Sequence, residues 1–192
     1  VSIEESLIQD FENWRIDIAR DIKKYHPDFS GELITEAVQL ILDRFLFMKV
    51  LADREIEEDY IQKIITKIQE NKDKQEYILY NECKENYIEL DKIYNGNIFS
   101  EKPELDFITI SKKTLLAILP NFLLDNSAYN LEILPIAVLS NVYDKFLGNV
   151  IRTTLGNRIV IESTPEVRKA GGVYYNPEYI VNYIVEKTVA ER

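Results

Sequence analysis

The sequence predicts a mainly α-helical fold, a multi-helix bundle with a small β element near the C-terminus. Apolar residues recur every three or four positions through most of residues 1–94, which is the period of a helix that buries one side. The alternating, β-branched pattern of a strand is confined to short stretches of the second half. With 192 residues, the chain suits one domain, or one and a fraction.

Helical periodicity predicts four helices in the first half, over about residues 2–25, 30–51, 56–69 and 73–93. Their ends carry start and stop signals. Ser2 to Glu5 forms a capping box, and Ser30 is a good N-cap because its side-chain oxygen can accept from a free backbone N–H. His26-Pro27 ends the first helix, and Asn95-Gly96 marks a turn after the fourth.

Shorter elements are expected in the second half: a strand at about residues 106–111, a short helix from Ser111 or Lys112 that Pro120 interrupts, a helix from Pro135 to Gly148 and a strand over residues 158–162. A domain boundary is predicted between Asn149 and Asn157. Residues 1–150 would then form a helical domain, and residues 151–192 would begin a second domain.

The net charge of −10 is unevenly distributed. Residues 1–100 carry 13 Lys and Arg against 22 Asp and Glu, a net −9, whereas residues 101–192 carry 10 against 11, a net −1. An acidic surface repels DNA phosphates. The first half is therefore not expected to coat DNA.

The expected compartment is the cytoplasm. A single cysteine, Cys83, excludes an internal disulfide framework and favours a reducing environment. The N-terminal residues are charged at helical spacing and contain no apolar signal-peptide core. Pro120 and Pro135 interrupt the longest apolar runs, and no membrane span is expected because a span takes about 20 apolar residues.

The most informative segment lies near the C-terminus. It begins with the basic pair Arg168-Lys169, and a glycine pair and Tyr174-Tyr175 follow. Asn176 is then a good N-cap, and Pro177 suits the first position of a helix. A loop that leads into a helix N-terminus can hold the carboxylate of a small ligand.

This segment resembles motif X of the N6-adenine DNA methyltransferases in which that S-adenosylmethionine (SAM) motif comes first, with the pattern R-K-x-x-G-x-Y-Y-T-P-x-x-I-V. The matching residues are Arg168, Lys169, Gly172, Tyr174, Tyr175, Pro177, Ile180 and Val181. The family's usual Thr is Asn176 here, which keeps the N-cap oxygen but changes the volume and the donors of the side chain.

The resemblance implies a role for each of these residues. Tyr174 and Tyr175 would lie near the cofactor, and Asn176 would hydrogen-bond near its amino-acid end. Pro177 and Ile180 would shape the wall of the pocket. Arg168-Lys169 would touch DNA phosphate or brace the loop, and both roles stay open.

Three upstream segments extend the resemblance to fused restriction–modification enzymes of the Eco57I and MmeI kind, the type IIG family. Residues 40–54 are similar to their LLxRLLFLRFxEDR helix, residues 95–99 to their NGGLF, and residues 139–148 to their LGxIYExFLG. In these enzymes a nuclease is followed by a helical connector, a methyltransferase and a target-recognition domain. The resemblance therefore assigns residues 1–150 to the connector and residues 151–192 to the start of the SAM-dependent methyltransferase.

The family's DPAxGSG and NPPY motifs do not occur in this sequence, nor does a convincing Asp…Glu-x-Lys nuclease constellation. We therefore predict no catalytic residue in this chain, which is expected to be a fragment that cannot methylate alone. The resemblance implies a parent enzyme, an adenine-specific DNA methyltransferase that uses SAM and binds double-stranded DNA. Its other domains would be the partners of this chain, and Mg2+ is implied only if a nuclease lies upstream.

Two alternatives stay open. In the first, the chain is a non-catalytic helical protein-interaction module whose apolar faces serve a partner. In the second, the methyltransferase stands without a nuclease, and the sequence does not distinguish this from the fused form.

Other chemistry-bearing residues favour structural roles. His26 is expected at the surface or as a cap, and one His with one Cys cannot make a metal set. Cys83 is expected to be inert. The acidic run at residues 55–59 favours a solvated face over a divalent-ion site. Arg44 and Arg54 are expected to pair with acidic neighbours.

Overall fold

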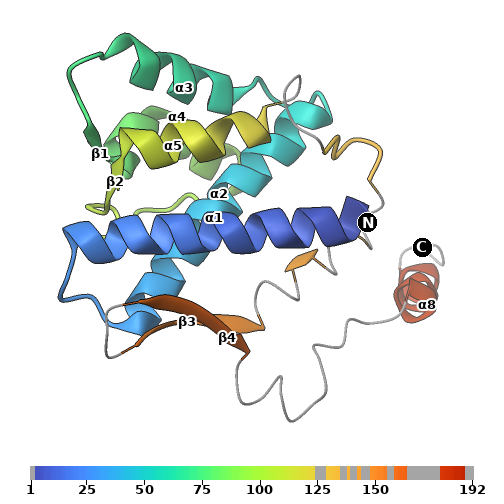
Figure 1. The fold of residues 1–192 in the computed structure, drawn as a ribbon. Coiled ribbons are helices and arrows are strands. Elements are labelled where there is room, and N and C mark those ends of the chain that lie inside the picture. Colours follow the sequence, from blue (N-terminus) through green and yellow to red (C-terminus); the bar gives the residue numbers. More distant parts are fainter. Residues whose placement is uncertain are drawn as a thin grey trace.

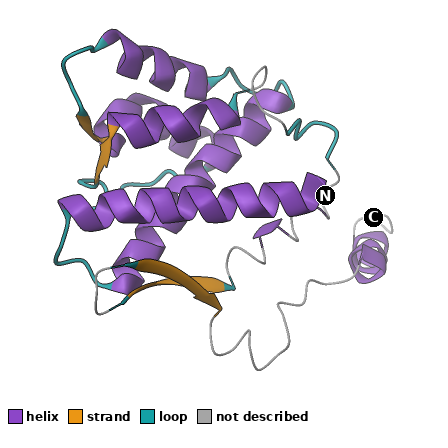
Figure 2. Cartoon of the chain, in the orientation of Figure 1, coloured by secondary structure: helices purple, strands orange, loops and turns teal. Residues whose placement is uncertain are grey.

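The computed structural model describes residues 3–123, 129–134, 138, 142–143, 148–154, 158–163 and 178–188. The helices described are α1 (Ile3–Tyr25), α2 (Gly31–Asp53), α3 (Tyr60–Glu70), α4 (Leu79–Tyr94), α5 (Lys112–Ile118), the 3-10 helix η1 (Leu119–Phe122) and α8 (Glu178–Thr188). The strands are β1 (Glu76–Ile78), β2 (Thr109–Ser111), β3 (Asn149–Thr153) and β4 (Ile159–Ser163). The predicted fold class, mainly α with a small β element near the C-terminus, is confirmed (Figure 2).

The bundle is organised around α2. This helix contacts α1, α3 and the β3–β4 hairpin through β3. Figure 1 shows α3, α4 and α5 on one side of α1 and the hairpin on the other, with α2 crossing behind α1 and reaching both sides. α2 therefore joins the helical body to the hairpin, together with α1, which contacts β4.

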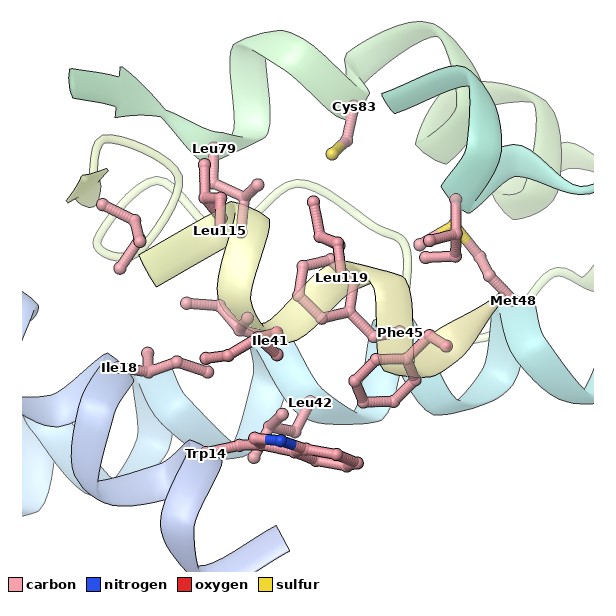
Figure 3. Packing of buried hydrophobic residues seen from close by; sticks show 14 of the residues in the cluster. Trp14, Ile18, Ile41, Leu42, Phe45, Met48, Leu79, Cys83, Leu115 and Leu119 are labelled. Carbon is pink, nitrogen blue, oxygen red and sulfur yellow. The ribbon is translucent and has the colours of Figure 1, made fainter. Parts of the chain in front are cut away.

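A continuous apolar core fills the space between α1, α2, α4 and α5 (Figure 3). Phe122 of η1 is buried in this core, with its ring centroid 4.9 Å from that of Trp14 and 5.6 Å from that of Phe45. Fully burying an apolar side chain of this size contributes about 1.5–3 kcal/mol. Burial of these side chains therefore stabilises the packing of the helices against one another.

The predicted helix starts and stops are largely confirmed. Ser30 accepts from Leu33 N at 3.2 Å, and Ser111 caps α5 in the same way. α1 ends at Tyr25, directly before His26-Pro27. Asn95 ends α4 in the left-handed region, with φ 44°. No described helix combines the length and the apolarity needed to cross a membrane.

The third and fourth helices begin later than predicted. α3 starts at Tyr60 because the Asp59 side chain caps it, accepting from Gln62 N at 3.0 Å. α4 starts at Leu79 because β1 precedes it where the sequence predicts helix. β1 pairs antiparallel with β2 in the register Tyr77↔Ile110, a long-range contact that local periodicity does not reveal.

The β elements also differ in extent from the prediction. β2 begins at Thr109 because turn hydrogen bonds, such as Ile108 N to Leu105 O at 3.2 Å, hold the residues before it. β4 agrees with the predicted strand, but its partner β3 was missed and lies where the sequence placed a domain boundary. The division at residue 150 stays a prediction. Of the helix predicted from Pro135, Val138, Val142 and Tyr143 are helical, and much of the rest lies outside the described residues.

Candidate functional site

The predicted cofactor-binding and DNA-binding residues lie almost wholly outside the part of the chain that the structure describes. Six of these residues fall there: Arg168, Lys169, Tyr174, Tyr175, Asn176 and Pro177. Ile180 is described, and it lies half-buried in the first turn of α8. The cofactor and DNA roles of all seven residues stay predictions.

The helix that follows this site, α8, exposes large apolar side chains. Tyr179 is 73% exposed, Tyr183 62% and Ile184 52%. A helix with apolar residues on several sides normally lies buried against other elements. α8 therefore offers an apolar surface that the described residues leave uncovered.

Upstream, the segments that carry the resemblance meet on α2. Arg44 Nε donates to Ile98 O at 2.8 Å, and Arg44 Nη2 donates to Ser100 O at 3.0 Å. Its third group, Nη1, pairs with Asp106 at 3.4 Å, so the predicted acidic partner of Arg44 is confirmed. The guanidinium also lies 4.5 Å from the Tyr87 ring centroid. One buried arginine thus fixes the loop after Asn95-Gly96 onto the helix.

A buried ion pair lies further along α2. Lys49 Nζ and Asp53 Oδ2 are 2.8 Å apart, and their side chains are 3% and 0% exposed. Lys49 also donates to Leu123 O at 3.5 Å, and Asp53 accepts from Leu131 N at 2.7 Å. The pair therefore holds the chain on both sides of residues 124–128.

Asp43 of α2 contacts the third segment of the resemblance. Gln39 Nε2 donates to Asp43 Oδ1 at 2.9 Å, and Tyr143 also hydrogen-bonds to this carboxylate. Burial raises the pKa of Asp43 to about 6, although the two hydrogen bonds act in the opposite direction. Like Arg44, this carboxylate joins α2 to a segment distant in sequence.

The β3–β4 hairpin is held to α1 and α2 by polar contacts. Arg15, which is 1% exposed, donates from Nη2 to Asn149 O at 2.7 Å. Thr35 Oγ1 accepts from Ile151 N at 2.9 Å and donates to Gly31 O at 2.8 Å. Burial lowers the pKa of Arg15 to about 10, which leaves its guanidinium charged at neutral pH.

The residues expected to be structural prove to be so. His26 Nε2 accepts from Thr109 N at 3.0 Å and joins the end of α1 to β2. Cys83 is fully buried, which raises the pKa of its thiol to about 12 and makes it unreactive. Arg54 is the exception, because it forms no ion pair within the described part of the chain.

The described residues offer no metal set, and two cavities beside α2 are too small for a cofactor. No group of three or more His, Cys, Asp or Glu among the described residues could hold a metal ion. In the acidic run, Asp59 instead caps α3 and Glu57 accepts from Tyr94 Oη at 3.1 Å. One cavity beside Arg44 and another beside Lys49 have a volume of about 10 Å³, which is room for a single water.

Comparison with known proteins places these contacts in context. The chain is similar to a restriction–modification protein along almost its whole length. It is 23% identical over 191 residues to the type II restriction enzyme and methyltransferase RM.Eco57I of Escherichia coli, a match that covers 99% of this chain. The chain spans 18% of the length of that relative. No protein-family model and no solved structure matches the chain.

Sequence reasoning missed the residues that hold the hairpin and the ion pair of α2. Lys49 and Asp53 carry a signal that could have been used, since they are spaced i, i+4 among the apolar residues of one helix. Gly31 and Thr35 carry none, because their partners lie 116 or more residues away.

Proposed function

We propose that the chain is the helical connector and first SAM-binding element of a site-specific N6-adenine DNA methyltransferase fused to a restriction nuclease. The observation that carries the proposal is the similarity to RM.Eco57I over 99% of the chain. The motif X resemblance of residues 168–181 supports its finer part, the assignment of SAM and of adenine N6.

The helical body would act as a rigid spacer between the two active sites. Its core is continuous, and buried charges of α2 hold loops that would otherwise be free to move. Its acidic character favours DNA contacts made elsewhere in the parent enzyme. A spacer of this kind fixes the distance between cutting and methylating sites.

The C-terminal segment would form one wall of the SAM pocket. Methyl transfer moves the methyl group from the SAM sulfonium to adenine N6, after the base has been flipped out of the duplex. Tyr174 and Tyr175 would contact the cofactor, Asn176 would hydrogen-bond near its amino-acid end, and Arg168-Lys169 would meet DNA phosphate. The exposed apolar residues of α8 support this, because they suit a helix that packs into the rest of a methyltransferase domain.

The test uses the natural gene product that contains this chain, with unmethylated double-stranded DNA and labelled SAM. We expect label at adenine N6 and Mg2+-dependent cleavage of the DNA. Asn176→Ala should raise the KM for SAM by about tenfold, through loss of a hydrogen bond to a charged group. Asn13→Ala, an exposed asparagine of α1, is the matched control and should leave the KM unchanged.

An opposite result is equally clear. A gene product that neither binds SAM nor transfers its methyl group would overturn the proposal. The helical protein-interaction module would then be the better description, and α8 would be its first candidate surface.

A further inference from the structure

The β3–β4 hairpin meets the helices through the backbone edge of β3. In the antiparallel register, Val150 is opposite Glu162 and Ile151 is opposite Ile161. Successive residues of a strand turn their N–H and C=O groups alternately toward and away from the partner strand. The contacts of Asn149 O and Ile151 N with Arg15 and Thr35 show that these two residues turn theirs away from β4 and toward the helices.

Two side chains of the helices, Thr35 and Arg15, hydrogen-bond to backbone groups of β3 that lie two residues apart. Ile151 N donates to Thr35 Oγ1 at 2.9 Å, and Asn149 O accepts from Arg15 Nη2 at 2.7 Å. A shift of the hairpin by one residue would present groups that point the other way. Contacts from α1 and α2 therefore fix where the hairpin lies along the bundle.

Gly31 permits the close approach of the two backbones. A Cβ at this position would lie 3.0 Å from Ile151 O, and that atom belongs to the backbone of β3 rather than to a flexible side chain. Gly31 is the first residue of α2, where an alanine would suit the helix better than a glycine. The close approach of β3, rather than the needs of the helix, therefore explains why this position is a glycine.

We propose that Arg15, Gly31 and Thr35 are positioning residues that seat the β3–β4 hairpin and so fix the point from which the cofactor loop begins. β4 ends at Ser163, directly before residues 164–177, which carry four of the five predicted SAM contacts. The cofactor part of this inference rests on the proposed function, whereas the docking of the hairpin does not.

The variants separate this role from general stability. Thr35→Val removes the hydroxyl and keeps the branched shape, whereas Thr35→Ser keeps the hydroxyl and should restore wild-type behaviour. Gly31→Ala adds a methyl group against Ile151 O. The matched controls are Thr66→Val, an exposed residue whose hydroxyl donates within α3 to Gln62 O, and Gly96→Ala, where the nearest atom to the added Cβ is 3.8 Å away.

Two readouts on the natural gene product decide the inference. Hydrogen exchange of residues 149–154 reports docking, and the kinetics of methyl transfer from labelled SAM report the loop. In Thr35→Val and Gly31→Ala, we expect exchange about tenfold faster and a KM for SAM about fivefold higher, the scale of one lost hydrogen bond. The kcat should stay within about twofold, because the transferring groups lie elsewhere.

Each contrary result has a distinct meaning. Unchanged exchange in both variants would show that these residues do not seat the hairpin, and faster exchange with an unchanged KM would show that the hairpin does not position the loop. Either result overturns the inference. A wild-type protein without SAM binding would overturn the proposed function and the cofactor part, and exchange alone would then decide the docking part.

Discussion

Helix α2 carries three buried charged residues, Arg44, Lys49 and Asp53, none of which is more than 4% exposed. Burying a charge is costly unless other groups satisfy it. Each of the three makes an ion pair and also binds backbone groups of a distant segment. These residues therefore determine how loops attach to α2, rather than forming a catalytic centre.

Asp53→Ala tests the ion pair. It leaves the Lys49 ammonium buried without a counter-charge and Leu131 N without its acceptor. We expect the free energy of unfolding, measured by urea titration, to fall by about 3 kcal/mol. Asp17→Ala, which removes an exposed pair with Arg20, is the control and should change it by less than about 1 kcal/mol. Equal losses in the two variants would contradict this role of Asp53.

Asp43→Asn tests whether burial raises the pKa of the Asp43 carboxyl. The pKa of Asp43 is raised to about 6 from 3.8, so the folded chain holds this proton more tightly than the unfolded chain. The stability that this contributes is present below the unfolded pKa and is lost as pH rises through the folded pKa. The neutral variant should therefore gain stability relative to wild type between about pH 4 and pH 7, by at most about 3 kcal/mol.

The measurement is urea unfolding of both proteins across that pH range. Asparagine keeps the size of the side chain and one oxygen that can accept from Gln39, so packing is preserved. A difference in stability that does not vary with pH would show that Asp43 is not buried as described.

At the scale of elements, Arg44 attaches the loop between α4 and β2 to α2. Arg44 binds Ile98 O, Ser100 O and Asp106, a fork of donors that lysine cannot reproduce. Arg44→Lys should lower the free energy of unfolding by about 2–3 kcal/mol and speed proteolysis within residues 97–106. Arg20→Lys, at an exposed helix position, should change neither. Proteolysis as slow as in wild type would exclude this attachment.

Elements with local signals could be predicted from the sequence, and elements that depend on distant partners could not. The caps Ser30 and Ser111 start α2 and α5 as predicted, since a cap acts within three residues. β1 was predicted as helix because its partner β2 lies 35 residues away, at Glu76↔Ser111. Asp59 is a cap signal that was present in the sequence and was overlooked.

The candidate site follows the same division. Resemblance alone suggested Tyr174, Tyr175 and Asn176, and the described structure leaves their roles as predictions. The structure instead brings forward Gly31 and Thr35, whose contact with Ile151 crosses most of the chain. No pattern of neighbouring residues encodes such a contact.

At the scale of the whole molecule, the described residues form a helical body with the β3–β4 hairpin attached to it, which suits the proposed role of a spacer. The core joins α1, α2, α4 and α5, and the hairpin leaves this body on the opposite side of α1 from α3, α4 and α5 (Figure 1). The similarity to RM.Eco57I covers the body and the C-terminal segment together. Under the proposed function, the exposed apolar residues of α8 suit contact with the rest of the methyltransferase.

Photo-crosslinking of labelled SAM to the natural gene product tests the central claim most directly. The labelled peptide is identified by mass spectrometry after digestion. We predict label within residues 168–185, at Tyr174 or Tyr175, and its loss when unlabelled SAM competes. Label found only outside this chain, or none that SAM displaces, would contradict the assignment of the first SAM-binding element to these residues.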